Sequence, residues 1–452
     1  MLVQLLALAT FVAVFALAAI RNVNIGLVMF PFAAAIGLGL ADMALEDVIG
    51  GFPLSILVLL VGVTYFFGIA HSNGTIEWLI DAVISRVGGR DGLFPLVFFL
   101  LTAAISAMGA PLGGLVMAPV GMTVAARRGL DPMLMALAMG TGLSAGAFAP
   151  TSLFGIITWG TADSAGIDLN PMLLFGLALA MNLVLLAVAH LMFGRRPRPV
   201  TEEPAVAGPT GGSGAGREIG GYGQTSLQLK TQATAVRQAV TDGTVAPPTT
   251  LQVVTLVAMA TLVISVVVIA VTGGEPDIGV LGFALGALLA VIDPAAGKRA
   301  MTRIDWGSVL LVGGIITYVG VLKEMGVLDM LGESAAALGT PVLAAFLLCV
   351  VAGLISAFAS TTGMLAALVP LSLPLISEGG VPGWALICAI GVCASIVDVS
   401  PFSTVGATYV ATAEAEDRPR LTSLLTRWGL AMVAVGPIAL TLLLILPGKV
   451  IA

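Results

Sequence analysis

The sequence predicts an all-α polytopic membrane protein made of two inverted repeats, each with five transmembrane helices and one re-entrant hairpin. The first observation is composition. Of the 452 residues, 58% are hydrophobic and 10% are charged, and the mean hydropathy is +1.08, whereas soluble domains carry roughly a quarter charged residues. The second observation is a pair of hydrophobic segments interrupted by small and polar residues. The third is a repeat that relates the two halves of the chain.

The two interrupted segments have the pattern of re-entrant hairpins. Ile-Ser-Ala occurs at 105–107 and again at 355–357, and each copy runs into a short cluster of Gly, Pro, Ser or Thr before a second apolar arm. Each arm has about 14 to 16 residues, fewer than the roughly 20 that a bilayer span needs. Polar, non-helical backbone at membrane depth is tolerated where protein or a water-filled cavity surrounds it. Two such tips therefore predict a binding site between them.

The first half divides into five spans, an amphipathic helix on the membrane interface and one hairpin. We expect spans over residues 2–20, 24–40, 53–70, 132–162 and 171–193, the interfacial helix over 75–87 and the hairpin over about 93–126. The segment 2–20 lacks a basic start and a convincing cleavage site, so we expect a membrane helix there rather than a signal peptide. Pro150 lies inside the fourth span and should break it, because proline donates no backbone hydrogen bond.

The second half repeats this order after a linker. Residues 199–250 are rich in Pro, Gly, Ser and Thr, so we expect a loop there that separates repeats at 1–198 and 251–452. Gly62 matches Gly314 at a separation of 252 positions, and Pro150 matches Pro401 at 251. The second half should therefore contain its own hairpin and its own span broken at Pro401.

The number of passes and the charges predict the orientation. Five crossings are an odd number, so the second repeat begins on the opposite side of the membrane and is inverted. With the 199–250 loop in the cytoplasm, all 19 Lys and Arg except Lys323 and Lys449 fall on the cytoplasmic side. This positive-inside bias predicts a plasma (inner) membrane protein with both termini on the outer face.

Inverted repeats with opposed hairpins and broken helices are typical of secondary transporters with a site near the midplane. Hydroxyls and the positive ends of half-helices can hold a carboxylate. The candidate substrate-binding residues at the second tip and beyond the broken prolines are Ser360, Thr361, Thr362, Thr151, Ser152, Ser403 and Thr404. The alternative is that these small hydroxyl residues only allow close helix packing and bond their own backbone.

Asp398 is the ionisable residue that the sequence singles out, because it precedes Pro401 in an otherwise apolar span. A charge at that depth is costly unless it serves an ion path or is paired. We expect Asp398 to bind the coupling cation, sodium or a proton, with Ser106 and Ser356 as helpers. The alternative is a carboxylate that caps the broken helix.

Several motifs resemble a known family. Arg-Asn-Val-Asn-Ile-Gly-Leu at 21–27, Leu-Val-Gly-Val-Thr-Tyr-Phe-Phe-Gly-Ile-Ala at 60–70, Asn-Gly-Thr at 73–75 and the paired hairpins are similar to the MatC-type malonate and dicarboxylate carriers. These belong to the ion transporter superfamily, together with the divalent anion:sodium symporters. The resemblance covers nearly the whole chain except residues 199–250.

The resemblance implies a homodimer, an elevator-like moving domain, and symport of a dicarboxylate with sodium or protons. In the divalent anion symporters each hairpin tip carries Ser-Asn-Thr. This chain has Ser-Thr-Thr at 360–362, but Gly109, Ala110 and Pro111 at the first tip. These three residues are the candidate substrate contacts on that side, and they offer no side-chain donor.

Other functions remain open. Within transport, the substrate could instead be another organic anion such as a sugar acid, or the chain could be a cation/proton antiporter. An intramembrane hydrolase would need a nucleophile and a base at one depth, and neither His71 nor His190 lies near the hydroxyl clusters. A non-transporting membrane scaffold would keep the same repeats. We expect a transporter rather than an enzyme, with no cofactor, no metal site and no nucleic-acid partner.

Overall fold

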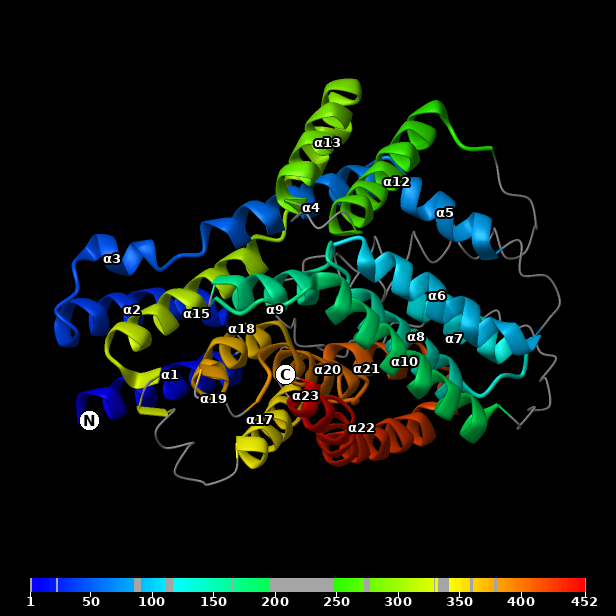
Figure 1. The fold of residues 1–452 in the computed structure, drawn as a ribbon. Helices are drawn as coiled ribbons and strands as arrows, with labels where there is room; N and C mark the ends of the chain where they lie inside the picture. The colour runs from blue at the N-terminus through cyan, green and yellow to red at the C-terminus, as the bar shows by residue number, and fades with distance from the viewer. Residues whose placement is uncertain are drawn as a thin grey trace.

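The computed structural model describes most of the chain outside the linker. The described residues are 2–21, 23–84, 91–109, 117–164, 166–194, 247–271, 277–328, 330–331, 341–357, 361–377 and 381–451. All regular structure within these ranges is helical (Figure 1). The expected linker at 199–250 lies almost entirely outside them, as do the tips of both hairpins.

The first half contains the expected order of helices. They are α1 (Leu2–Arg21), α2 (Ile25–Leu40), α3 (Leu45–Gly50), α4 (Leu54–Ser72), α5 (Thr75–Ile84), a 3₁₀ turn (Asp91–Leu93), α6 (Phe94–Ala107), α7 (Met117–Arg127), α8 (Pro132–Ala147), α9 (Leu153–Ser164) and α10 (Pro171–Phe193). Asn24 and Asn170 begin α2 and α10 as N-caps, because their side chains accept hydrogen bonds from the first free backbone N–H groups. The short helix α3 is one element that the sequence did not predict.

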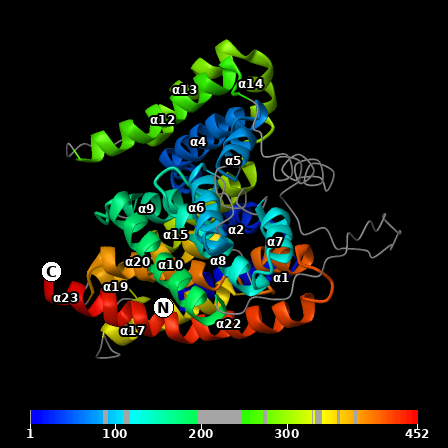
Figure 2. The same ribbon diagram turned by 90° about the vertical axis from the view of Figure 1, so that its right-hand side faces the viewer.

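The second half follows the same order. It contains α12 (Thr250–Val271), α13 (Ile278–Ile292), α14 (Pro294–Met301), α15 (Trp306–Glu324), α17 (Pro341–Ser356), α18 (Thr361–Leu371), α19 (Leu373–Ser377), α20 (Gly383–Ile396), α21 (Thr404–Thr412), α22 (Arg418–Leu440), a π-helical turn (Thr441–Ile445) and α23 (Leu446–Ile451). Asp293 ends α13 and caps α14, which the sequence also did not predict. In both views α12 and α13 lie at the top of the molecule and α22 lies at the bottom (Figures 1 and 2).

The helices have the length and composition of a multi-pass membrane protein. Among the described residues, 4 helices are long and apolar enough to cross a bilayer: Leu54–Ser72, Pro171–Phe193, Trp306–Glu324 and Arg418–Lys449. Several shorter apolar helices accompany them, including α6, α17 and α18, which are arms of the predicted hairpins. The arms α7 and α18 have 11 residues each, which is too short for a span of roughly 20 residues.

The two halves pack crosswise against each other. Helix α2 of the first half packs on α15 of the second, and α13 of the second half packs on α4 of the first. Glycines allow both contacts: a Cβ added at Gly26 would lie 2.1 Å from the Leu310 carbonyl oxygen, and one added at Gly62 would lie 2.3 Å from the Gly279 carbonyl oxygen. Because the second helix of each half packs on the third span of the other half, the two halves are packed into each other.

The broken helices α8 and α20 lie in the interior. Every residue of α8 is buried, as are Ala385 to Ile396 of α20. A helix that is apolar on all sides is stable where protein surrounds it. Helix α6 covers α8 and α17 covers α20, so each first hairpin arm packs on the broken helix of its own half.

Helices α8 and α20 run antiparallel at their contact. Ser144 bonds Ser395, a Cβ at Gly140 would meet Val399, and one at Gly391 would meet the Phe148 ring. Residue numbers therefore rise along one helix as they fall along the other. This places the two breaks at opposite ends of the contact.

Candidate functional site

The first break joins the first hairpin arm to the broken helix. Helix α8 ends at Ala147 and α9 begins at Leu153, with Pro150 between them. Thr151 Oγ1 donates a 2.6 Å hydrogen bond to the Ala107 carbonyl oxygen, and Ser152 Oγ donates one of 2.6 Å to the Ser106 carbonyl oxygen. The two hydroxyls therefore satisfy carbonyls that the end of α6 leaves without helical partners.

Gly109 lies where the first hairpin tip begins. Its φ of +95° belongs to the left-handed region, which glycine adopts without a steric penalty. A Cβ added there would lie 3.0 Å from Val63 and 3.6 Å from the Thr151 carbonyl oxygen. The start of the tip is thus held between α4 and the first break. The candidate contacts Ala110 and Pro111 lie outside the described residues.

The second break joins the second hairpin to Asp398 through side chains. Thr361 Oγ1 donates a 2.6 Å hydrogen bond to Asp398 Oδ2, and Ser356 Oγ lies 2.7 Å from Thr361 Oγ1. A threonine hydroxyl has one proton. Because Thr361 donates it to the carboxylate, Ser356 must be the donor to Thr361. The three side chains form a chain of hydrogen bonds in which Ser356 of α17 donates to Thr361 at the start of α18, and Thr361 donates to Asp398 in the break after α20.

The other predicted hydroxyls of the second half have different positions. Ser403 caps α21: its hydroxyl accepts from the Gly406 N–H at 3.2 Å and has the backbone carbonyls of Ser400 and Asp398, both in the break, as alternative acceptors for its single proton. Thr404 is exposed, and Pro401 lies in the turn between α20 and α21. Thr362 is buried in the first turn of α18. Ser360 lies outside the described residues.

Asp398 is the acidic group of this arrangement. Its side chain is partly buried, and within the described ranges the recorded ion pairs lie elsewhere, at His71–Glu77 and Arg420–Asp131. A carboxylate in an apolar interior is unfavourable without a charge partner or hydrogen bonds. Thr361 provides one hydrogen bond, and a bound cation would provide the compensating charge.

A buried polar cluster lies between the two breaks. Ser144 Oγ donates to Ser395 Oγ at 2.8 Å, and Asn182 Nδ2 of α10 donates to Ser144 Oγ at 3.2 Å. Helix α8 ends three residues beyond Ser144 and α20 ends one residue beyond Ser395, so with a rise of ~1.5 Å per residue the two helix ends lie on the order of 6 Å apart along the helices. The sequence predicted no role for Asn182, although it is a polar residue in an apolar span.

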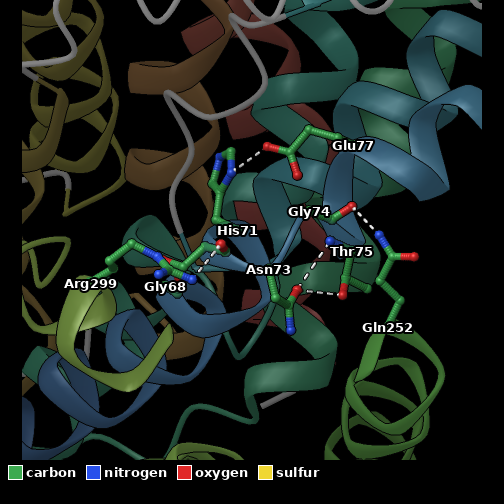
Figure 3. Close-up of polar contacts among 9 residues, drawn as sticks. Gly68, His71, Asn73, Gly74, Thr75, Glu77, Gln252 and Arg299 are labelled. Atoms are coloured by element: carbon green, nitrogen blue, oxygen red, sulfur yellow. Dashed lines mark hydrogen bonds and ion pairs between the residues drawn. The ribbon is translucent and has the colours of Figure 1, made fainter. Parts of the chain in front are cut away.

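A second polar cluster lies at the turn between α4 and α5 (Figure 3). His71 Nδ1 pairs with Glu77 Oε1 at 2.8 Å. Gln252 of α12 donates to the Gly74 carbonyl oxygen at 3.2 Å, and Arg299 of α14 donates to the Ser72 carbonyl oxygen at 3.3 Å. Gln4 of α1 binds the corresponding turn of the other half, with Nε2 at 3.3 Å from the Gly326 carbonyl oxygen. These contacts close the turn between α4 and α5.

Comparison with known proteins gives a family for the start of the chain. Residues 1–147 match the family model described as the dicarboxylate carrier protein MatC N-terminus.

The resemblance to the MatC-type carriers is confirmed over these residues.

The matched residues 1–147 include the first arm of the predicted hairpin and all of α8. A stretch of 105 residues is 33% identical to an uncharacterized transporter of Methanocaldococcus jannaschii, and the match covers 23% of this chain and 24% of that relative. The chain thus spans about a quarter of the length of this curated relative.

A solved structure shares the fold. The crystal structure of the Alcanivorax borkumensis YdaH transporter matches with a TM-score of 0.57 and 15% identity, over 88% of this chain and 86% of that one. At this identity the similarity concerns the arrangement of the helices. It covers both halves, whereas the family match is confined to the first.

Proposed function

We propose that this protein is a secondary active transporter that imports a small dicarboxylate, malonate or a C4-dicarboxylate, by cation-coupled symport. The observation that carries the proposal is the hydrogen bond between Thr361 and Asp398. Thr361 begins α18, the second arm of the predicted hairpin, and Asp398 lies in the break after α20. One hydroxyl therefore connects the candidate substrate site to the candidate cation site. The match of residues 1–147 to a dicarboxylate carrier family supports the substrate class.

We assign the two halves as inverted repeats. Three observations support this assignment: the crosswise packing of α2 on α15 and of α13 on α4, the antiparallel contact of α8 with α20, and the presence in each half of a hydrogen bond between the hairpin and the break of the same half. Inverted repeats with hairpins in opposite directions support alternating access. We propose that the hairpins and broken helices move together as an elevator against α4 and α15, in a homodimer in the plasma membrane with both termini outside.

The substrate carboxylates bind at the helix starts in this proposal. Thr361 and Thr362 form the first turn of α18, where free backbone N–H groups and the positive end of the helix dipole favour an anion. In the first half, Thr151 and Ser152 lie at the break beside the tip that contains Gly109. Asp398 takes the coupling cation, with Ser356 and Ser106 at the ends of the first arms.

The experiment that tests the proposal is uptake of labelled malonate and succinate into proteoliposomes with an imposed sodium gradient, an imposed proton gradient or neither. We expect accumulation that requires one of the gradients. Asp398→Asn should retain folding and exchange but lose gradient-driven accumulation. If folded protein accumulates neither acid under any gradient, the dicarboxylate assignment is wrong.

A second candidate is symport of an organic anion with one carboxylate, such as a sugar acid. The observation in its favour is the first break, where Thr151 and Ser152 already donate their protons to the end of α6. That half then offers mainly backbone groups to a substrate. Uptake of labelled gluconate, measured beside malonate, distinguishes the two substrates. A cation/proton antiporter would instead show ion exchange without either acid.

A further inference from the structure

Thr361 has one proton for two acceptors if the proposed function is correct. In this structure its hydroxyl donates to Asp398 Oδ2 and accepts from Ser356. In the proposed function the same hydroxyl donates to a substrate carboxylate. A hydroxyl cannot donate its single proton to both, so substrate binding would remove the side-chain hydrogen bond that the structure gives to Asp398. The inference that follows rests on the proposed function at this step.

Tyr409 of α21 is a buried hydrogen-bond donor close to the same carboxylate. Its side chain is fully buried, and within the described residues its hydroxyl has no hydrogen-bond partner. The ring lies beside Gly140 of α8 together with Val399, the residue that follows Asp398. The Asp398 carboxylate is near enough to interact electrostatically with the tyrosine.

A buried hydroxyl without a partner is unfavourable and requires an explanation. Tyr318 provides the contrast within this molecule. It is equally buried, but its hydroxyl donates to the Ala7 carbonyl oxygen at 3.1 Å. The fold therefore gives the Tyr318 hydroxyl a hydrogen-bond acceptor but leaves the Tyr409 hydroxyl without one, near an ionisable carboxylate.

We propose that Tyr409 is the alternative hydrogen-bond donor to Asp398 when the substrate takes the proton of Thr361. Asp398 thus exchanges one donor for another as the substrate binds. Tyr409 is a positioning residue in this scheme, since it acts on the cation site and not on the substrate. Thr361 is the shared donor that makes the cation site sensitive to whether the substrate is bound.

The first test requires no transport and no substrate. Thr361→Val removes the donor and so imitates its capture by a substrate. Tyr409→Phe should leave the melting temperature of the otherwise wild-type protein unchanged or raise it, because the orphan hydroxyl is lost. In the Thr361→Val background the same change should lower the melting temperature by about 2 °C or more, because Tyr409 is then the donor to Asp398. Equal effects in both backgrounds would overturn the proposal.

The second test uses labelled malonate in proteoliposomes. We expect Tyr409→Phe to keep malonate exchange within about twofold and to reduce gradient-driven accumulation about tenfold, the effect of one hydrogen bond to a charged group. The matched control is Tyr318→Phe, which should lower the melting temperature and leave the ratio of accumulation to exchange unchanged. Wild-type accumulation by Tyr409→Phe, or equal loss of exchange and accumulation, would refute the role. Absence of any malonate transport by the wild type would instead count against the proposed function, and the melting test would still decide the role of Tyr409.

Discussion

Ser144 and Ser395 are joined by a hydrogen bond of 2.8 Å between their hydroxyl oxygens, and they are 251 positions apart in the chain. Pro150 and Pro401 have the same separation in the sequence. Residues at equivalent positions of two repeats touch each other where the axis that relates the repeats passes between them. The contact therefore gives the proposed inverted repeats a specific centre, in the buried contact between α8 and α20.

We expect Ser144→Ala to destabilise the protein by about 1–3 kcal/mol, because Asn182 Nδ2 loses an acceptor and Ser395 loses a donor in a buried site. Ser395→Ala should have a smaller effect, because Ser144 still accepts from Asn182. Thermal unfolding of the purified protein measures both. The double variant should lose less than the sum of the single variants, and additive losses would contradict a shared cluster.

The crosswise packing predicts strong position dependence for glycine substitutions. Gly26→Ala should destabilise by about 1–3 kcal/mol, since its Cβ would lie 2.1 Å from the Leu310 carbonyl oxygen. The matched control is Gly176→Ala in α10, where a Cβ would meet nothing within 4 Å. That change should be neutral or stabilising by about 0.5–1 kcal/mol, because alanine is the better helix former. Similar melting temperatures for both variants would argue against the close contact of α2 with α15.

The ion pair between Arg420 and Asp131 should stabilise the ends of α22 and α8. Asp131 is 4% exposed, caps α8 through the Met133 N–H, and lies 2.7 Å from Arg420 Nη2. Arg420→Ala leaves this buried carboxylate without its charge partner, at a cost of about 1–3 kcal/mol. Arg427→Ala, an exposed position of the same helix, should change stability by less than about 0.5 kcal/mol. Thermal unfolding of the two purified variants beside the wild type measures both changes in stability.

Thr151→Val tests the link between the first break and its hairpin. The variant keeps the shape of the side chain but loses the hydrogen bond to the Ala107 carbonyl oxygen, and we expect the malonate concentration for half-maximal uptake to rise about tenfold. Thr158→Val is the control, since that buried hydroxyl bonds the Phe154 carbonyl of its own helix. It should transport like the wild type. An equal change in both variants would mean that general loosening of α9, not the hairpin link, is the cause.

The sequence was sufficient for the order of the elements. The lengths of the apolar runs located the spans of the described residues to within a few positions, and Pro150 and Pro401 located the breaks, because the loss of a backbone donor is a local property. The short helices α3 and α14 were missed, since each has few residues and little hydrophobic pattern. The roles assigned to Thr151, Ser152, Ser403 and Thr404 stay predictions.

Tertiary structure alone decided which side chains meet. From the sequence, Asp398, Thr361 and Ser356 were separate candidates, and the structure joins them into one chain of hydrogen bonds. It also placed the Tyr409 ring beside Val399, the neighbour of Asp398, and Asn182 beside Ser144. No local sequence pattern distinguishes these two polar residues from an interfacial tyrosine or an amide that only packs between helices. The physical reason is that periodicity and breakers act within a few residues, whereas the partner of a buried polar group depends on how helices distant in the chain are packed.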